Sequence, residues 1–280
     1  MSAPTRAFVA SSLAALVGAA LLHLLVLAGQ LQRWPAMVHL ALLGWATGMI
    51  FAVSYHTMPR FAARDFPYPR LIGAHWVTFS GGVALAAAPL GNGQEVGILG
   101  LVLEGVAALL FVANTLLLFL RGREHAQPAP LPATTIQAEV DRSGTLATQG
   151  AALCLPIALV LLLLVRLRWI AAGWLLAAEH LVVLGWLMLM MVGVAYHVLP
   201  RFSQRRVRGA GWARAQVALH GAALAVMIPA LGFGWTPLFP VGGILMALAI
   251  GLFAWTVWPT LEPLRPQPVP VRATHRGGAG

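Results

Sequence analysis

Histidines recur at matching places in the two halves of this 280-residue sequence. The matched pairs are His39 with His180 and His56 with His197, both 141 residues apart, and His75 with His220, 145 residues apart. Neutral imidazole is a strong ligand for iron and copper, whereas packing and lipid-facing positions never require it. A duplication that carries three histidine pairs therefore predicts ligands for a metal or a metal-containing cofactor.

The composition indicates that these histidines lie within a lipid bilayer. The chain is 59% hydrophobic and 9% charged, which is far more apolar than a soluble domain of this size requires. Eight apolar runs are long enough to cross about 30 Å of hydrocarbon. They cover residues 7–30, 35–59, 70–90, 95–120, 147–166, 171–199, 212–232 and 237–259. We therefore predict an all-α, polytopic membrane protein with eight transmembrane helices.

The arginines predict the orientation of these helices. With the N-terminus inside, fifteen arginines fall in inner segments, and only Arg33, Arg166 and Arg168 fall in outer loops. This bias follows the positive-inside rule and predicts cytoplasmic N- and C-termini in a bacterial inner (plasma) membrane. The net charge of +10 is thus a feature of topology and does not indicate binding of nucleic acid.

The chain divides into two similar units. Residues 1–120 form the first four-helix repeat, and 147–260 form the second. Residues 121–146 are polar and proline-rich, which predicts a cytoplasmic linker, and 261–280 are predicted to be a disordered cytoplasmic tail. An even number of spans gives both repeats the same orientation, related by a pseudo-twofold axis along the membrane normal.

Helical geometry sorts the histidines into two tiers. Seventeen residues at 1.5 Å each separate His39 from His56 by about 25 Å along one helix, so these two cannot share a metal. His39 and His180 form an outer tier, and the other four form an inner tier. Two tiers of histidine on transmembrane helices are typical of membrane cytochromes, in which two imidazoles hold a haem iron. We expect His39 and His180 to hold one haem b.

The inner tier allows several arrangements. His56 with His75, and His197 with His220, could each bind within one half, or all four could surround one site. A second haem, copper or non-haem iron is compatible with neutral imidazoles, and a polar layer without metal is the alternative. Beside this tier, Arg60 and Arg201 suit haem propionates, although their Pro-Arg-Phe sequences could equally serve to end helices.

Two acidic residues are unusual for their depth in the membrane. Glu179 could accept a hydrogen bond that orients an outer ligand. Glu104, about ten residues into its helix, is either a protonated packing residue or a proton-handling group.

Several short stretches of the first half resemble a known family. They are His39-Leu-Ala-Leu-Leu-Gly-Trp, Tyr55-His-Thr-Met-Pro-Arg-Phe, His75-Trp76 and Leu110-Phe-Val-Ala-Asn114. They are similar to the four-helix unit of the haem-copper oxidase catalytic subunit (subunit I), including its nitric oxide reductase branch and their short membrane relatives. The resemblance implies a haem ligand at His39 and, through the repeat, at His180. It covers two four-helix arcs, where that superfamily has three.

The sequence also departs from that superfamily, because it has no adjacent His-His pair and no His-x-His pair. The binuclear site of a terminal oxidase needs those ligands, so the chain is not expected to be a terminal oxidase by itself. The leading hypothesis is a b-type haem membrane protein, or membrane cytochrome, for electron transfer or for redox or diatomic gas handling.

The sequence contains no Cys-x-x-Cys-His and no nucleotide-binding glycine loop. A quinol or a cytochrome is therefore the expected electron donor. Alternatives are a transporter of copper, haem or a small solute between two similar halves, and an accessory subunit of a respiratory complex. A homo-oligomer is also compatible with the sequence.

Overall fold

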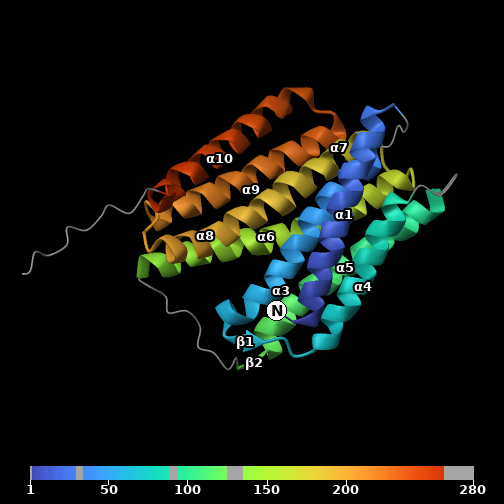
Figure 1. Ribbon diagram of the computed structural model, residues 1–280. Helices are drawn as coiled ribbons and strands as arrows, with labels where there is room; N and C mark the ends of the chain where they lie inside the picture. Colours follow the sequence, from blue (N-terminus) through green and yellow to red (C-terminus); the bar gives the residue numbers. More distant parts are fainter. Residues whose placement is uncertain (1, 30–33, 89–93, 125–134, 262–280) are drawn as a thin grey trace, which may run out of the picture.

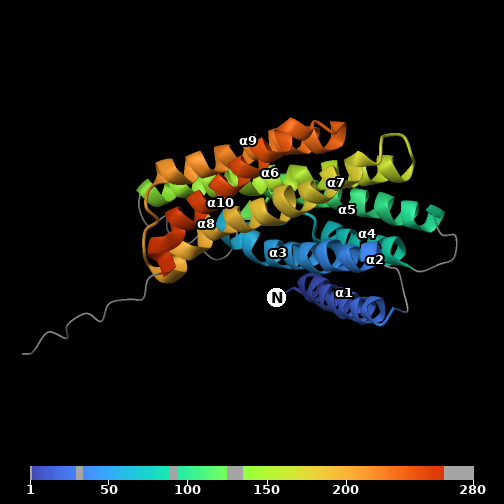
Figure 2. The same cartoon turned by 90° about the horizontal axis from the view of Figure 1, so that it is seen from above.

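The computed structural model describes residues 2–29, 34–88, 94–124 and 135–261, and in these residues the chain is almost wholly helical (Figure 1). The first half contains α1 (Ala3–Leu27), α2 (Trp34–His39), η1 (Leu40–Thr47), α3 (Gly48–Ala62), β1 (Arg64–Asp65), α4 (Pro69–Ala87), α5 (Gln94–Arg121) and β2 (Arg123–Glu124). The second contains α6 (Thr135–Arg166), α7 (Gly173–His180), η2 (Leu181–Met188), α8 (Leu189–Ser203), α9 (Ala210–Phe233), η3 (Thr236–Leu238) and α10 (Phe239–Leu261). Seen from above, α1 lies at one edge of the bundle and α9 at the opposite edge (Figure 2).

Seven helices of the described part are long and apolar enough to cross a membrane, which confirms a multi-pass membrane protein. The segments α2, η1 and α3 form one of them, and α7, η2 and α8 form another. The remaining predicted span, 70–90, is the third in chain order. It corresponds to α4, which is a helix but is not among the seven. Arg70, His75 and Thr78 lower its mean hydropathy. Large apolar side chains on the outer surface, such as Leu24 and Leu120, match a lipid environment.

The same helix contacts occur in both halves. Helix α1 packs against η1 and α3 as α6 packs against η2 and α8, and α4 packs against α5 as α9 packs against α10. Local backbone features repeat as well. The two π-helices begin 141 residues apart. The left-handed residues that end α3 and α8, Ala63 (φ 50°) and Gln204 (φ 54°), are separated by the same number. The repetition seen in the sequence therefore extends to backbone geometry.

The two halves meet where α5 packs on α6 and where η1 contacts η2. Trp186 of η2 is fully buried there, and its indole Nε1–H donates to Thr47 Oγ1 at 2.8 Å. Its ring lies against Phe51 and Phe111, with centroids 5.7 and 6.0 Å away. The equivalent Trp45 is 38% exposed. The two halves thus contact each other through η1 and η2, but this contact is one-sided.

Glycines allow close approach of paired helices. A Cβ on Gly82 of α4 would lie 2.8 Å from the backbone nitrogen and from Cγ of Glu104 on α5. A Cβ on Gly193 of α8 would lie 2.7 Å from the carbonyl oxygen of Gly144 on α6. In the first half, this close packing fixes the position of Glu104.

The predicted linker, 121–146, is only partly correct. Helix α6 begins at Thr135, and β1 pairs with β2 in a two-residue antiparallel ladder. The helix begins inside this segment because its first turns are amphipathic rather than apolar: Val140 is fully buried, while the charged residues Glu139 and Arg142 are exposed. Residues 125–134 of the linker and 262–280 of the predicted tail lie outside the described residues.

Candidate functional site

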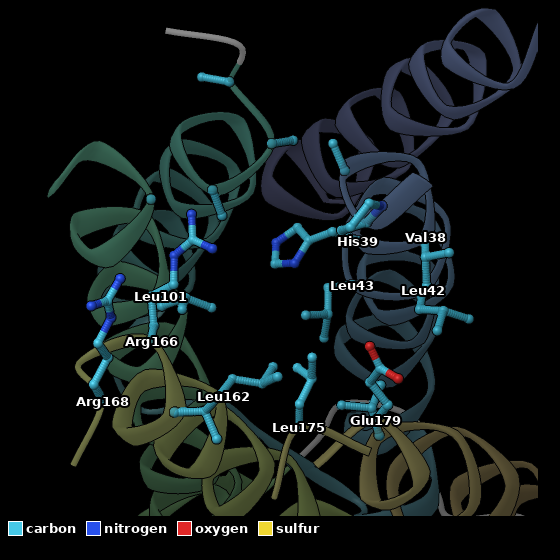
Figure 3. Close-up of a pocket in the computed structure, with 18 residues that line it drawn as sticks. Val38, His39, Leu42, Leu43, Leu101, Leu162, Arg166, Arg168, Leu175 and Glu179 are labelled. Atoms are coloured by element: carbon cyan, nitrogen blue, oxygen red, sulfur yellow. The ribbon is translucent and has the colours of Figure 1, made fainter. Parts of the chain in front are cut away.

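A cavity of about 650 Å³ opens between the two halves, at the end of the bundle that the arginines predict to be external (Figure 3). Its walls come from α2, η1, α4, α5, α6, α7 and η2 and consist mainly of leucine, valine and alanine. The ionisable residues that line it are His39, Arg166, Arg168 and Glu179. Mainly apolar walls, a few polar groups and this volume are typical of a site for a small organic ligand or cofactor.

The His39 ring projects into this cavity from α2 (Figure 3), and its Nε2 lies 2.7 Å from Oε1 of Glu104. The glutamate is 2% exposed and the histidine 15% exposed. An imidazole N–H donating to a buried carboxylate is the arrangement that fixes the orientation of metal-binding histidines. Neither of the two roles foreseen for Glu104 included this contact. The signal in the sequence was that Glu104 and His39 both lie in the outer halves of their predicted helices.

Both outer histidines are followed directly by a π-helix. π-helical segments are rare and occur frequently at functional sites, because each shifts the register of side chains and carbonyls. In η1, Thr47 Oγ1 donates to the carbonyl of Leu42 at 3.0 Å. In η2, the carbonyl of Leu184 accepts a hydrogen bond from His220 Nε2 at 3.0 Å. Side chains therefore satisfy carbonyl groups within both π-helices.

His180 does not share the cavity with His39. Its Nδ1 donates to the Leu176 carbonyl one turn earlier at 2.8 Å, and it is not among the residues that line the cavity. The adjacent Glu179 lines the cavity instead, because neighbouring residues on a helix point about 100° apart. Glu179 is thus not seen to orient His180, and no contact between the His39 and His180 rings occurs in the described residues.

His75 lies in the core of the first half. Asn114 Nδ2 donates to the Tyr55 hydroxyl at 3.0 Å, and that hydroxyl donates to His75 Nδ1 at 2.8 Å. The His75 ring contacts Phe8 and Phe51, with centroids 5.0 and 4.4 Å away. His75 is therefore enclosed by aromatic side chains, apart from the other histidines.

The second half contains the same tyrosine contact with a different partner. Tyr196 donates to Gln216 Oε1 at 3.2 Å, and both residues lie 141 positions after Tyr55 and His75. Gln216 is thus the counterpart of His75, so the predicted pairing of His75 with His220 is wrong. His220 lies ten residues after the start of α9, about 15 Å into the membrane. Its contact with η2 places it away from the inner tier.

His197 and Arg201 belong to a polar cluster at the opposite end of the bundle from the cavity. Asp141 of α6 accepts from His197 Nδ1 at 3.0 Å and from both terminal nitrogens of Arg201 at 2.9 and 2.8 Å. Gln137 also donates to this carboxylate. Arg201 therefore already binds a carboxylate, which argues against the predicted propionate role. The sequence reasoning missed Asp141 because it assigned that residue to the linker.

The remaining inner residues are not gathered into a site. Arg60 is exposed, and His56 lies one helical turn before it, near the end of α3. In the part of the chain that the structure describes, no three His, Cys, Asp or Glu side chains are grouped to hold a metal ion. The four inner-tier histidines consequently do not assemble into a common metal centre there.

Comparisons with known proteins do not assign the chain to a family. No protein-family model matches it, and no curated protein is significantly similar to it in sequence.

Proposed function

We propose that this protein binds a haem b in the cavity between its halves, with His39 as an axial ligand. The observation that supports this most strongly is the His39 ring, which projects into the cavity while its Nε2 is held by the buried Glu104. Metal-binding histidines commonly use one nitrogen for the metal and the other for a carboxylate. In this arrangement Nδ1 of His39 is the nitrogen that would bind the iron.

The other walls of the cavity suit the same cofactor. The macrocycle needs an apolar slot, which the leucine, valine and alanine side chains offer. Arg166 and Arg168 line the same cavity, and guanidinium groups pair with the carboxylates of haem propionates through two parallel hydrogen bonds. These residues replace Arg60 and Arg201 in the propionate role.

The number of histidines bound to iron distinguishes electron transfer from gas handling. A haem supplies a redox-active iron, and with one protein ligand it has a coordination position open to a diatomic gas. Among the histidines that the structure describes, His39 alone lines the cavity, which favours gas handling. One nitrogen of His180 is bonded to a backbone carbonyl, and metal-binding histidines often show this pattern. Ligation by both histidines would favour electron transfer from a quinol or a cytochrome.

We further propose a bacterial plasma-membrane location with cytoplasmic termini and two repeats related by a pseudo-twofold axis. The arginine distribution and the repeated helix contacts support these proposals. Association into a homo-oligomer or with a respiratory complex is compatible with them.

Absorption spectroscopy of the purified protein tests the haem proposal. Expressed with adequate haem, the wild-type protein should show a Soret band that shifts with carbon monoxide or nitric oxide. His39→Ala should lose most of the bound haem, and the matched control His56→Ala, on the same span but at the opposite end, should retain it. If His180→Ala loses haem as well, both histidines are ligands. A colourless wild-type protein refutes the proposal.

Transport is a second candidate, because a cavity that opens between two halves, with a buried carboxylate bonded to the histidine in its wall, is also a feature of solute sites. Copper or solute uptake into vesicles that contain the protein measures this activity. Uptake that is abolished by Glu104→Gln in a colourless protein would favour transport over haem binding.

A further inference from the structure

A second, much smaller void lies on the inner side of the His39–Glu104 pair. It has a volume of about 10 Å³. Two residues that line it carry polar side-chain atoms, Glu104 and Thr47, and the other five are apolar: Leu43, Phe51, Phe79, Leu155 and Leu159. Oε2 of Glu104 has no hydrogen-bond partner in the described structure, although the residue is only 2% exposed.

A carboxylate oxygen that is buried without a partner is unfavourable, and buried polar groups of this kind are commonly satisfied by ordered water. To hold one water molecule, a void needs a volume of about 10–15 Å³ and at least two polar partners. Glu104 Oε2 is the first partner. Thr47 Oγ1 donates to the Leu42 carbonyl and accepts from Trp186 Nε1, which leaves one lone pair for a further donor.

We propose that a single water molecule occupies this void, donating one hydrogen to Glu104 Oε2 and the other to Thr47 Oγ1. The void is too small for any larger ligand, and its two acceptor atoms match the two donors of water. The water completes a chain of hydrogen bonds that runs from the cavity histidine through Glu104 and Thr47 to Trp186 of the second half.

This arrangement gives Thr47 and Trp186 a role in the cavity that neither residue touches directly. The water holds the second oxygen of Glu104, so the carboxylate cannot rotate away from the His39 ring. Thr47 and Trp186 are thus positioning residues for His39. The consequence for haem rests on the proposed function, whereas the water site itself does not depend on it.

The second half has no equivalent water site. Its residue 141 positions after Thr47 is Met188. In the last helix of each half the repeat runs at an offset of 142, since Leu110-Phe111 matches Leu252-Phe253, and Glu104 then corresponds to Met246. Two methionines replace the two polar partners. One buried water per chain is therefore expected at this depth.

A density map of the full-length, haem-free protein at a resolution that reveals ordered water tests the site without any substitution. A peak within hydrogen-bonding distance of both Glu104 Oε2 and Thr47 Oγ1 is expected. A void without a peak, or a peak that contacts only one of these atoms, overturns the proposal.

Infrared spectroscopy of the same haem-free protein provides a second readout. The band of the Glu104 carboxyl group is assigned as the one that disappears in Glu104→Gln. Thr47→Val, which keeps the side-chain shape but lacks the hydroxyl, should shift this band, and Thr47→Ser should leave it in place. An unchanged band in Thr47→Val overturns the proposed water bridge.

The haem-loaded protein then separates the two proposals. If the wild type binds haem, Thr47→Val should bind it with an altered Soret position, and Thr47→Ser should match the wild type. An unaltered Soret band in Thr47→Val rejects the positioning role. A wild-type protein that shows the water peak but binds no haem refutes the haem proposal alone.

Discussion

Replacing Gly82 by alanine should push α4 away from α5 and disturb the carboxylate that holds His39. The new Cβ would lie 2.8 Å from Glu104 N and Cγ and 2.9 Å from the Gly100 carbonyl oxygen. Two of these three are backbone atoms that cannot rotate away. Ordinary contact begins at 3.4 Å, so the helices must separate by about 0.6 Å, the difference between 3.4 and 2.8 Å.

The size of the effect follows from two opposing contributions. Overpacking costs about 1–3 kcal/mol, and alanine regains about 1 kcal/mol over glycine through helix propensity. The free energy of unfolding should therefore fall by at most about 2 kcal/mol, which corresponds to a decrease in Tm of up to about 8 °C for a chain of this size. Thermal unfolding in detergent, followed by circular dichroism, measures the shift.

The neighbouring Gly81 supplies a matched control, because a Cβ there would meet no atom within 4 Å. Gly81→Ala should unfold at or slightly above the wild-type temperature. If Gly82→Ala and Gly81→Ala unfold at the same temperature, then α4 and α5 do not pack closely at Gly82. The inference that this packing fixes the position of Glu104 would then be wrong.

Two further substitutions test the contacts between elements by thermal unfolding. Trp186→Phe removes the buried hydrogen bond to Thr47 and should lower the free energy of unfolding by about 1–3 kcal/mol. Trp45→Phe, at the equivalent exposed position, should change the free energy of unfolding by less than about 0.5 kcal/mol. Equal effects of the two substitutions would contradict the one-sided contact. Asp141→Asn weakens the paired hydrogen bonds from Arg201 and should cost about 1–2 kcal/mol, less than for a fully buried pair because both groups are about one-fifth exposed. The adjacent, exposed Arg142 provides the control. An Arg142→Gln variant as unstable as Asp141→Asn would contradict a specific stabilising role of the Asp141 carboxylate.

The membrane-spanning helices were largely predictable because crossing a bilayer requires only a sufficiently long apolar run. That criterion fails where a helix has one polar face. The first turns of α6 carry Gln137 and Asp141 and are helical, although they lie in the predicted linker. Asp141 is bound there by His197 and Arg201 of α8, and such contacts do not register in local hydropathy.

Pairing between side chains was harder to predict, because it depends on hydrogen-bonding capacity and not on residue identity. The tyrosine of each half needs an acceptor, which His75 provides in one half and Gln216 provides in the other. Matching histidine with histidine required the offset to change from 141 to 145. The constant offset, rather than the shared residue type, identified the true counterpart.

The two halves share a scaffold but differ in their buried ionisable groups. Both have the π-helix, the left-handed residue after the following helix and the tyrosine hydrogen bond. In the described residues, the outer histidine of the first half is bonded to a buried carboxylate, whereas His180 is bonded to a backbone carbonyl and Met246 stands at the position that corresponds to Glu104. Ionisable groups within a bilayer are costly, so they tend to occur where they act. This asymmetry favours one cofactor per chain over the two that a strict duplication would hold, and a measured haem content near one per chain, lost on His39→Ala, is the expected result.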